Sequence, residues 1–298
     1  MKKVLSVLAG LSILIFSSTL FSCSSGPKRS MLITTVLNSC NSSLEAANGA
    51  ILSGDYEKAQ GLLSTAQNQA VSIDNSDLLI SVNLAYISLC LSYNPPRTDD
   101  AKLYLTKMEK LIEPSNNKKY SESLFCMAKT RILIAEKKDI ENIDNIIEEM
   151  DKALKGFKDD SYNLAQCYSI IGDLYRINSD YKSAQKYYED SVKIYTSEHY
   201  LSEIGITWYK IAQNYSLSGN KKGALEALNS AIYYDRCAEN SMALGADYYI
   251  KGVILLKGNP TSAEIEKAND ALIHSAEIYN AINLPELAQK SLNLVNNK

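Results

Sequence analysis

The sequence predicts an all-α protein built from repeated pairs of helices. A turn followed by a helix start recurs along the chain at an even spacing, and no stretch shows the alternation of polar and apolar residues that is typical of a strand. Of the 298 residues, 46% are hydrophobic and the formal net charge is -3. This composition excludes a disordered chain and a nucleic-acid binder with a basic surface.

The first 22 residues have the pattern of a secretory signal peptide. Lys2 and Lys3 form a short basic region, and residues 4–20 are apolar or small. A run of about 17 apolar residues is at the lower limit for crossing a bilayer. A transmembrane anchor and an ordinary cleaved signal peptide are the alternatives.

The end of the apolar run resembles the lipobox of bacterial lipoproteins. It reads Leu20, Phe21, Ser22 and Cys23, and Phe21 is larger than the residue usually found there. The resemblance implies that Cys23 becomes the lipid-bearing first residue, with residues 23–29 as a tether. Removal of residues 1–22 also removes two lysines, so the mature chain is more acidic. Acyl chains, and not a basic patch, would therefore hold the protein at a membrane.

Helix starts can be located from the turns that precede them. The clearest turns lie at residues 53–59, 178–184 and 218–224, and weaker ones at 95–101, 136–143 and 258–268. In these turns a Gly or Asn favours the left-handed conformation that ends one helix, and an Asp or Asn next to it caps the following one. The second helix of each pair is predicted to start near residues 55, 98, 139, 180, 220 and 261. The period is therefore close to 41 residues.

Two units have a clear core pattern. The fourth contains Tyr168, Ile171, Gly172, Tyr175, Ala184, Tyr188 and Ser191, and the fifth contains Trp208, Ile211, Ala212, Tyr215, Ala224, Leu228 and Ala231. An aromatic and an aliphatic residue at i and i+3 face the core, and a small residue at i+4 lets the partner helix approach. Both units resemble the tetratricopeptide repeat (TPR). The first unit keeps the same order, and the second, third and sixth follow from the period.

The resemblance implies a right-handed superhelical solenoid of about six TPR-like helix pairs over residues 30–298. Residues 284–295 begin with a Leu-Pro step and end before a polar tail, so we expect them to form a capping helix. The expected total is thirteen helices.

Catalytic and metal-binding patterns are absent from the sequence. The cysteines after Cys23 show no CxxC spacing and no paired histidine, so we expect them to be small buried thiols. They are Cys40, Cys90, Cys126, Cys167 and Cys237. No nucleophile-elbow, zinc-protease or nucleotide-binding motif occurs. We therefore expect no enzyme, no metal and no cofactor.

The TPR resemblance places a partner-binding wall on the first helices of the pairs. Carried over residue by residue, the inner wall includes Ile206 and Ser216, and the candidate partner-binding residues are Gln166, Ser169, Asp173, Arg176, Tyr209 and Gln213. Such a mixture of amides, charges and Tyr suits an extended peptide or a helix. The alternative is that these residues are only solvated helix faces. The Lys and Asn that clamp chaperone tails in the family are not at the matching positions.

These patterns together predict a lipid-anchored scaffold of the bacterial cell envelope. Its expected location is the outer membrane, facing the periplasm, and its expected partners are envelope or periplasmic proteins, with no nucleic acid. The alternative is an accessory lipoprotein of a periplasmic solute-binding or TRAP-type uptake system. A closed pore lined by Tyr would favour that alternative, and an open groove would not.

Overall fold

The computed structural model describes residues 34–136, 140 and 142–295. Those residues contain thirteen α-helices and no strand, which confirms the predicted all-α fold. None of the helices in the described part is long and apolar enough to cross a membrane. The predicted signal peptide, Cys23 and the tether lie outside the described residues.

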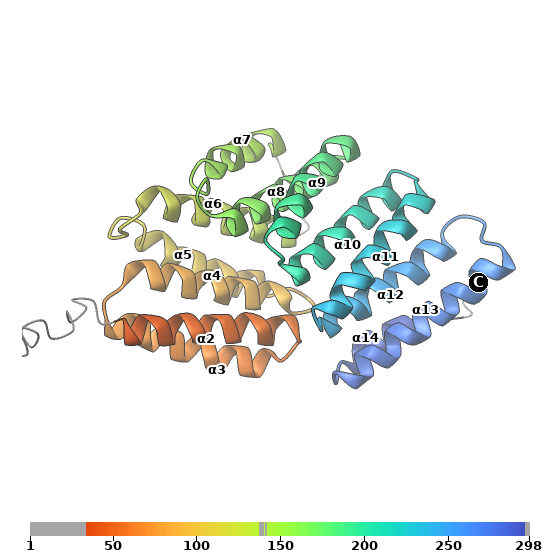
Figure 1. Cartoon of the computed structure of the whole chain (residues 1–298), viewed down its shortest axis with the longest axis horizontal. Coiled ribbons are helices and arrows are strands. Elements are labelled where there is room, and N and C mark those ends of the chain that lie inside the picture. Colours follow the sequence, from red (N-terminus) through yellow and green to blue (C-terminus); the bar gives the residue numbers. More distant parts are fainter. Residues whose placement is uncertain (1–33, 137–139, 141, 296–298) are drawn as a thin grey trace, which may run out of the picture. The chain divides into compact units, whose positions relative to one another are not determined.

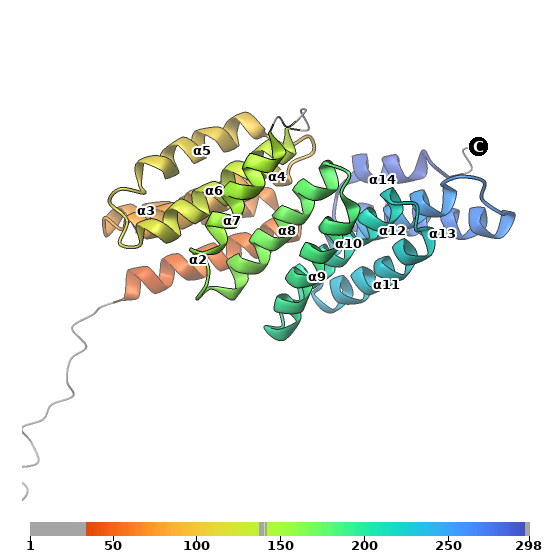
Figure 2. The ribbon, with the colours of Figure 1, turned by 90° about the horizontal axis from the view of Figure 1, so that it is seen from above.

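The helices follow one another as pairs joined by short turns (Figure 1). The first helices are α2 (Thr35–Leu52), α4 (Ser76–Ser92), α6 (Lys118–Ala135), α8 (Ser161–Ile177), α10 (Leu201–Leu217) and α12 (Ser241–Leu256). The second helices are α3 (Tyr56–Ser72), α5 (Thr98–Lys110), α7 (Ile143–Leu154), α9 (Tyr181–Ser197), α11 (Lys221–Cys237) and α13 (Ser262–Ala281). The short helix α14 (Pro285–Leu292) ends the array. Each helix packs beside its neighbours in sequence, as α8 to α11 do in both views (Figures 1 and 2).

The turns have the chemistry that the sequence predicts. The side chain of Asp55 accepts a hydrogen bond from the Lys58 backbone N–H at 3.2 Å and caps α3. Gly54, just before it, has a φ of 80°, which a residue without Cβ adopts at little cost. In the α8–α9 turn the left-handed residue is Ser179, with a φ of 61°. Asp180 then caps α9 in the same way as Asp55 caps α3.

The third pair departs from the prediction. Its second helix, α7, begins at Ile143 and not near residue 139. Asn142 precedes it with a φ of 56° and makes no capping hydrogen bond through its side chain. The Asp-capped turn seen in the first and fourth pairs is therefore not the start signal of α7.

Small residues lie where helices cross. Ala184 and Ala224 are completely buried, as predicted for residues at the crossing of two helices. The sixth pair uses Gly252 in this way, since a Cβ on Gly252 would lie 2.5 Å from the Cγ of Leu272. The size of the side chains at the contact between the two helices of a pair therefore sets how closely the helices approach.

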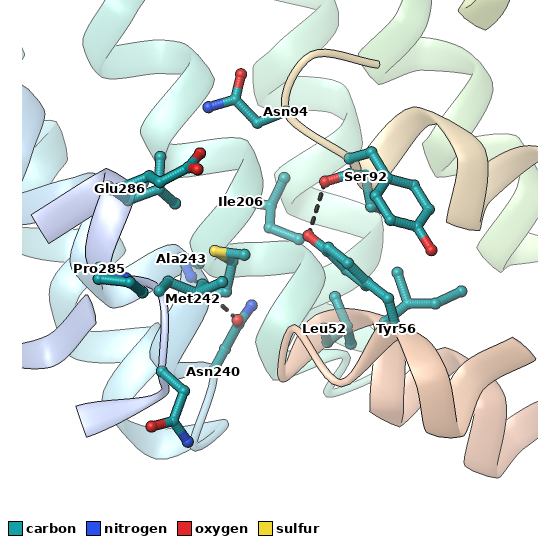
Figure 3. Close-up of a pocket in the computed structure, with 16 residues that line it drawn as sticks. Leu52, Tyr56, Ser92, Asn94, Ile206, Asn240, Met242, Ala243, Pro285 and Glu286 are labelled. Carbon is teal, nitrogen blue, oxygen red and sulfur yellow. Dashed lines mark hydrogen bonds between the residues drawn. The ribbon is translucent and has the colours of Figure 1, made fainter. Parts of the chain in front are cut away.

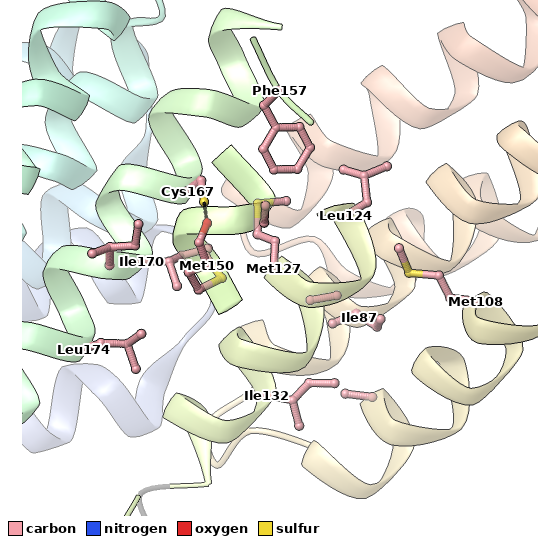
Figure 4. Close-up of a cluster of buried hydrophobic side chains, with 14 of the residues drawn as sticks. Ile87, Met108, Leu124, Met127, Ile132, Met150, Phe157, Cys167, Ile170 and Leu174 are labelled. Atoms are coloured by element: carbon pink, nitrogen blue, oxygen red, sulfur yellow. Dashed lines mark hydrogen bonds between the residues drawn. The ribbon is translucent and has the colours of Figure 1, made fainter. Parts of the chain in front are cut away.

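The largest buried cluster spans the second to fourth pairs (Figure 4). It contains Met108 from α5, Met127 from α6 and Phe157 from the turn before α8, all completely buried. The cysteines meet the expectation only in part. Cys40, Cys90 and Cys167 are buried and Cys126 is half-buried, but Cys237 is exposed, because it is the last residue of α11 and lies beyond the repeating core.

Candidate functional site

The first helices line a cavity of about 470 Å³, which we call the groove. Its wall is formed by side chains from α2, α4, α6, α8 and α10, with Tyr195 from α9. Polar members include Ser88, Arg131, Gln166 and Lys210. The groove includes part of the wall inferred from the sequence, and it reaches further toward the amino terminus than the fourth and fifth units.

The structure brings two of the predicted site residues to the groove lining. Gln166 and Ser169 line the groove, and Ile206 lies beside them. Tyr209 and Gln213 are half-buried on α10 and lie outside this lining. Partner binding by these residues stays a prediction.

Asp173 and Arg176 belong to an internal network. The Asp173 carboxylate lies 2.6 Å from Lys210 Nζ and 3.4 Å from Arg176 Nη2. It also accepts a hydrogen bond from the Tyr188 hydroxyl at 2.7 Å. Lys210 donates in addition to Ser169 Oγ at 2.8 Å. These contacts join α8, α9 and α10 and pair the single carboxylate of Asp173 with two cations, Lys210 and Arg176, within the fold.

The electrostatics of Asp173 follow from this network. Burial alone raises the pKa of its carboxyl group, but Lys210 and Arg176 outweigh burial and hold the pKa below its usual value. On the next first helix, burial raises the pKa of Tyr209 to about 12. The nearby Asp247 acts in the same direction, and Arg176 acts against it.

Arg131 is the groove residue that the sequence did not identify. Its Nη1 donates to Ser88 Oγ at 3.1 Å, and no carboxylate of the described residues forms an ion pair with it. Burial lowers its pKa, and the neighbouring Tyr162 and Tyr195 offset this in part. The register of α6 could not be assigned from the sequence, so no inner-wall residue was sought in the third unit. The 43-residue separation between Ser88 and Arg131, close to one repeat, is a signal that could have found it.

Tyr162 connects the groove wall to α10. Its hydroxyl donates to Glu203 Oε1 at 3.0 Å. Glu203 is therefore held by Tyr162, and it does not form an ion pair with Arg131.

A second cavity of about 620 Å³ adjoins the groove (Figure 3), and we call it the apolar pocket. Its lining is mostly apolar and comes from the α2–α3 turn, the end of α4, α10 and the starts of α12 and α14, with Leu52, Tyr56, Met242, Leu284 and Leu287 among its members. It shares Ile51, Leu52, Ser92 and Ile206 with the groove, so the two cavities lie next to each other.

Two polar features mark the wall of the apolar pocket. The Tyr56 hydroxyl donates to the Ser92 carbonyl at 2.7 Å. Asn240 caps α12 through its Oδ1, but its Nδ2 is buried and has no partner. In the described residues, no group of three or more His, Cys, Asp or Glu side chains is placed to hold a metal ion.

Neither a scan against protein-family models nor a search of curated proteins gives a match. Solved structures do match. A Rap protein complexed with competence and sporulation factor has a TM-score of 0.57 at 17% identity, over 87% of this chain and 75% of the Rap chain. The apo form of RapI has a TM-score of 0.57 at 15% identity, over 86% of this chain and 69% of RapI.

A third match is the STAND protein PH0952 from Pyrococcus horikoshii, which has a tetratricopeptide repeat sensor. The TM-score is 0.54 at 19% identity, and the match covers 86% of this chain but 38% of PH0952. At these identities the likeness concerns the fold alone. The chain therefore has a TPR-like helical-repeat fold.

Proposed function

We propose that the protein is a scaffold that binds other proteins by taking an extended peptide segment into the groove. The observation that carries this proposal is the groove itself, to which five consecutive first helices contribute. Some polar side chains of its lining have hydrogen-bonding capacity that contacts within the protein do not fill. Peptides bind in such grooves through polar contacts to their backbone and through pockets for their side chains. The structurally similar Rap protein was crystallised with a bound factor, the competence and sporulation factor, which supports a binding role.

The proposal includes attachment to a bacterial membrane through acylated Cys23. The supporting evidence is the sequence of the first 23 residues. The scaffold would then lie in the cell envelope, at the periplasmic face of the outer membrane, and its partners would be envelope or periplasmic proteins.

We propose no catalytic role for the protein. His199 and His274 are both exposed, and the contacts of His274 are an interaction with Glu277 at 3.2 Å and an edge-on packing against the ring of Tyr248. A nucleophile next to a base and an orienting third group is the usual minimum for covalent catalysis. The groove lining contains no histidine or cysteine that could provide such a base or thiol nucleophile.

An accessory role in solute uptake is the second candidate function. The volume of the apolar pocket favours it, because pockets for small molecules usually measure about 300 to 1,000 Å³. Tyr56 and Tyr93 both line this pocket. In that case the ligand would be a small apolar molecule and not a peptide.

Site-specific photo-crosslinking in intact cells tests the scaffold proposal. A photoreactive residue at position 166, in the groove, should crosslink to a discrete envelope protein. The same residue at the exposed position of Lys186 on α9 serves as the matched control and should give no such product. Filling the groove with Gln166→Trp should reduce capture without changing the helical spectrum. Crosslinking from position 186 and not from 166 would show that the partner binds the opposite face.

A further inference from the structure

We propose that the groove and the apolar pocket together select an extended peptide with an acidic residue and a large apolar residue two positions apart. This inference rests on the proposed function and specifies the chemistry of the partner. Arg131 would bind the acidic side chain, and the apolar pocket would take the apolar one.

The charges of the groove lining point to an acidic group. Two cations line the groove, Arg131 and Lys210. Lys210 is already paired with Asp173 at 2.6 Å, whereas Arg131 has a single hydroxyl partner, Ser88. A guanidinium carries five N–H donors in a planar fork that matches a carboxylate. Among the described residues of the lining, Arg131 is thus the cation with binding capacity left.

Arg131 lines the groove, and its guanidinium nitrogens are not among the buried atoms that lack a hydrogen-bond partner. The N–H groups that are not bonded to Ser88 are therefore not completely enclosed by the protein. The carboxylate of the lining, Glu203, accepts the hydrogen bond of Tyr162 and does not pair with Arg131. An incoming carboxylate would therefore meet a partly desolvated cation, where a charge-assisted hydrogen bond is stronger than in water.

The spacing of the two subsites follows from α4. Ser88 holds Arg131 in the groove, and Ser92, one helical turn later, lines both the groove and the apolar pocket. Four residues of a helix span about 6 Å. In an extended peptide, residues i and i+2 point to the same side and lie about 6.6 Å apart. An acidic side chain over Arg131 therefore places the side chain two positions away, on either side of it in the peptide, at the mouth of the apolar pocket.

The apolar pocket suits a peptide side chain for two reasons. Leu52, Met242 and Leu284 give it an apolar lining, so it favours an aliphatic or aromatic group. Asn240 adds a buried amide nitrogen without a partner, and Figure 3 shows this side chain among the sticks around the pocket. A peptide carbonyl that enters with the side chain would supply the missing acceptor.

A peptide series with the processed full chain tests the inference. The probes are fluorescent, N-acetylated and C-amidated octapeptides of Gly and Ser that contain Glu-x-Leu, Gln-x-Leu, Lys-x-Leu, Glu-x-Ser or Leu-x-Glu. We expect Glu-x-Leu and Leu-x-Glu to bind most tightly. Each of the other three peptides should bind about tenfold more weakly or worse, as expected for loss of a charge-assisted hydrogen bond or of apolar burial.

Three variants assign the two preferences. Arg131→Gln should abolish the preference for Glu over Gln, and Arg131→Lys should retain part of it. Ala246→Phe, which fills the apolar pocket, should abolish the preference for Leu over Ser while keeping the preference for Glu. Lys186→Gln, an exposed cation on α9, is the matched control and should change neither preference. Circular dichroism would show that each variant is folded.

The outcomes separate this inference from the proposed function. If wild type binds the peptides without regard to charge, or if Arg131→Gln keeps the Glu preference, the motif is wrong and the groove function stands. If no peptide binds but position 166 still crosslinks to a partner, the motif is wrong as well. If both experiments fail, the groove function is also wrong. Saturable binding of 1-aminoanthracene that Glu-x-Leu does not displace would make the pocket a small-molecule site and overturn the inference.

Discussion

Gly172 of α8 lies against the ring of Tyr188 of α9 so closely that a Cβ on Gly172 would be 2.7 Å from two of the ring carbons. Tyr188 is completely buried, and its hydroxyl donates to Asp173. The ring therefore cannot move aside without breaking this hydrogen bond. The close approach of α8 and α9 depends on the absence of a side chain at position 172.

Gly172→Ala should consequently destabilise the protein, by about 1 to 3 kcal/mol, as overpacking of a core usually does. Urea unfolding measures the change. Gly61→Ala in α3 is the control, because a Cβ at Gly61 would meet no atom within 4 Å. That variant should be stabilised by about 0.5 to 1 kcal/mol through the better helix propensity of Ala. Equal effects at the two positions would contradict the assigned contact.

Asp173→Asn should lower the free energy of unfolding by about 3 kcal/mol at pH 7, because it leaves Lys210 and Arg176 without their carboxylate. Since the fold holds the pKa of Asp173 below its unfolded value, the contribution is present above the unfolded pKa and is lost as the pH falls through the folded pKa. The difference from wild type should therefore shrink in acid. Urea unfolding at pH 7 and pH 3 tests this, with the exposed Glu226→Gln as a control.

Asp235 of α11 and Asp247 of α12 should make the protein less stable as the pH rises. Both are completely buried, and neither carboxyl group has a hydrogen-bond donor among the described residues. Burial raises the pKa of both groups, and for Asp247 the adjacent Asp235 raises it further. Their stabilising contribution is thus complete below the unfolded pKa of about 3.9 and is lost as the pH rises through the folded values.

Asp247→Asn should remove most of this pH dependence. We expect the variant to be more stable than wild type at pH 8 by at least about 1 kcal/mol, and the difference to disappear near pH 4. Thermal melts across this pH range provide the measurement. A variant less stable than wild type at pH 8 would show that the Asp247 carboxylate has hydrogen-bond donors in solution.

Cys23→Ser should leave an unprocessed precursor and abolish labelling with radioactive palmitate, because the sulfur of Cys23 is the atom to which the lipid would be attached. Mass spectrometry of the wild-type protein should find a mature chain that starts at Cys23 with added acyl mass. A mature chain that begins elsewhere and carries no acyl group would refute the lipoprotein prediction.

The helix boundaries could be predicted because short-range chemistry determines them. Asp55 and Asp180 cap the helices that follow them through contacts three residues away, and such contacts are visible in a sequence. The start of α7 could not be predicted in this way, because Asn142 makes no capping contact through its side chain. Where the local signal was missing, the period alone gave a start about four residues too early.

The groove could be predicted only in outline, because its chemistry depends on contacts between distant residues. Asp173 lies on the predicted wall, but Lys210 on α10 neutralises its charge, and no pattern within one repeat shows that pairing. Arg131 was missed because the register of α6 could not be assigned, and the apolar pocket was missed because its lining comes from distant pairs. The pocket combines Tyr56 of the first pair with Met242 of the sixth. Assigning site residues one repeat at a time cannot bring these two residues together.

The position of Gly54 has a consequence for how the chain folds. A Cβ at Gly54 would be 3.5 Å from Met242 Cε and 3.7 Å from Leu284 Cδ1, so the turn of the first pair packs beside α12 and the residue before α14. A repeat array usually has only nearest-neighbour contacts and frays from its ends. Contacts between the ends raise the contact order, which slows folding. The first pair leaves the ribosome first, yet it gains these contacts only after the last pair has been synthesised.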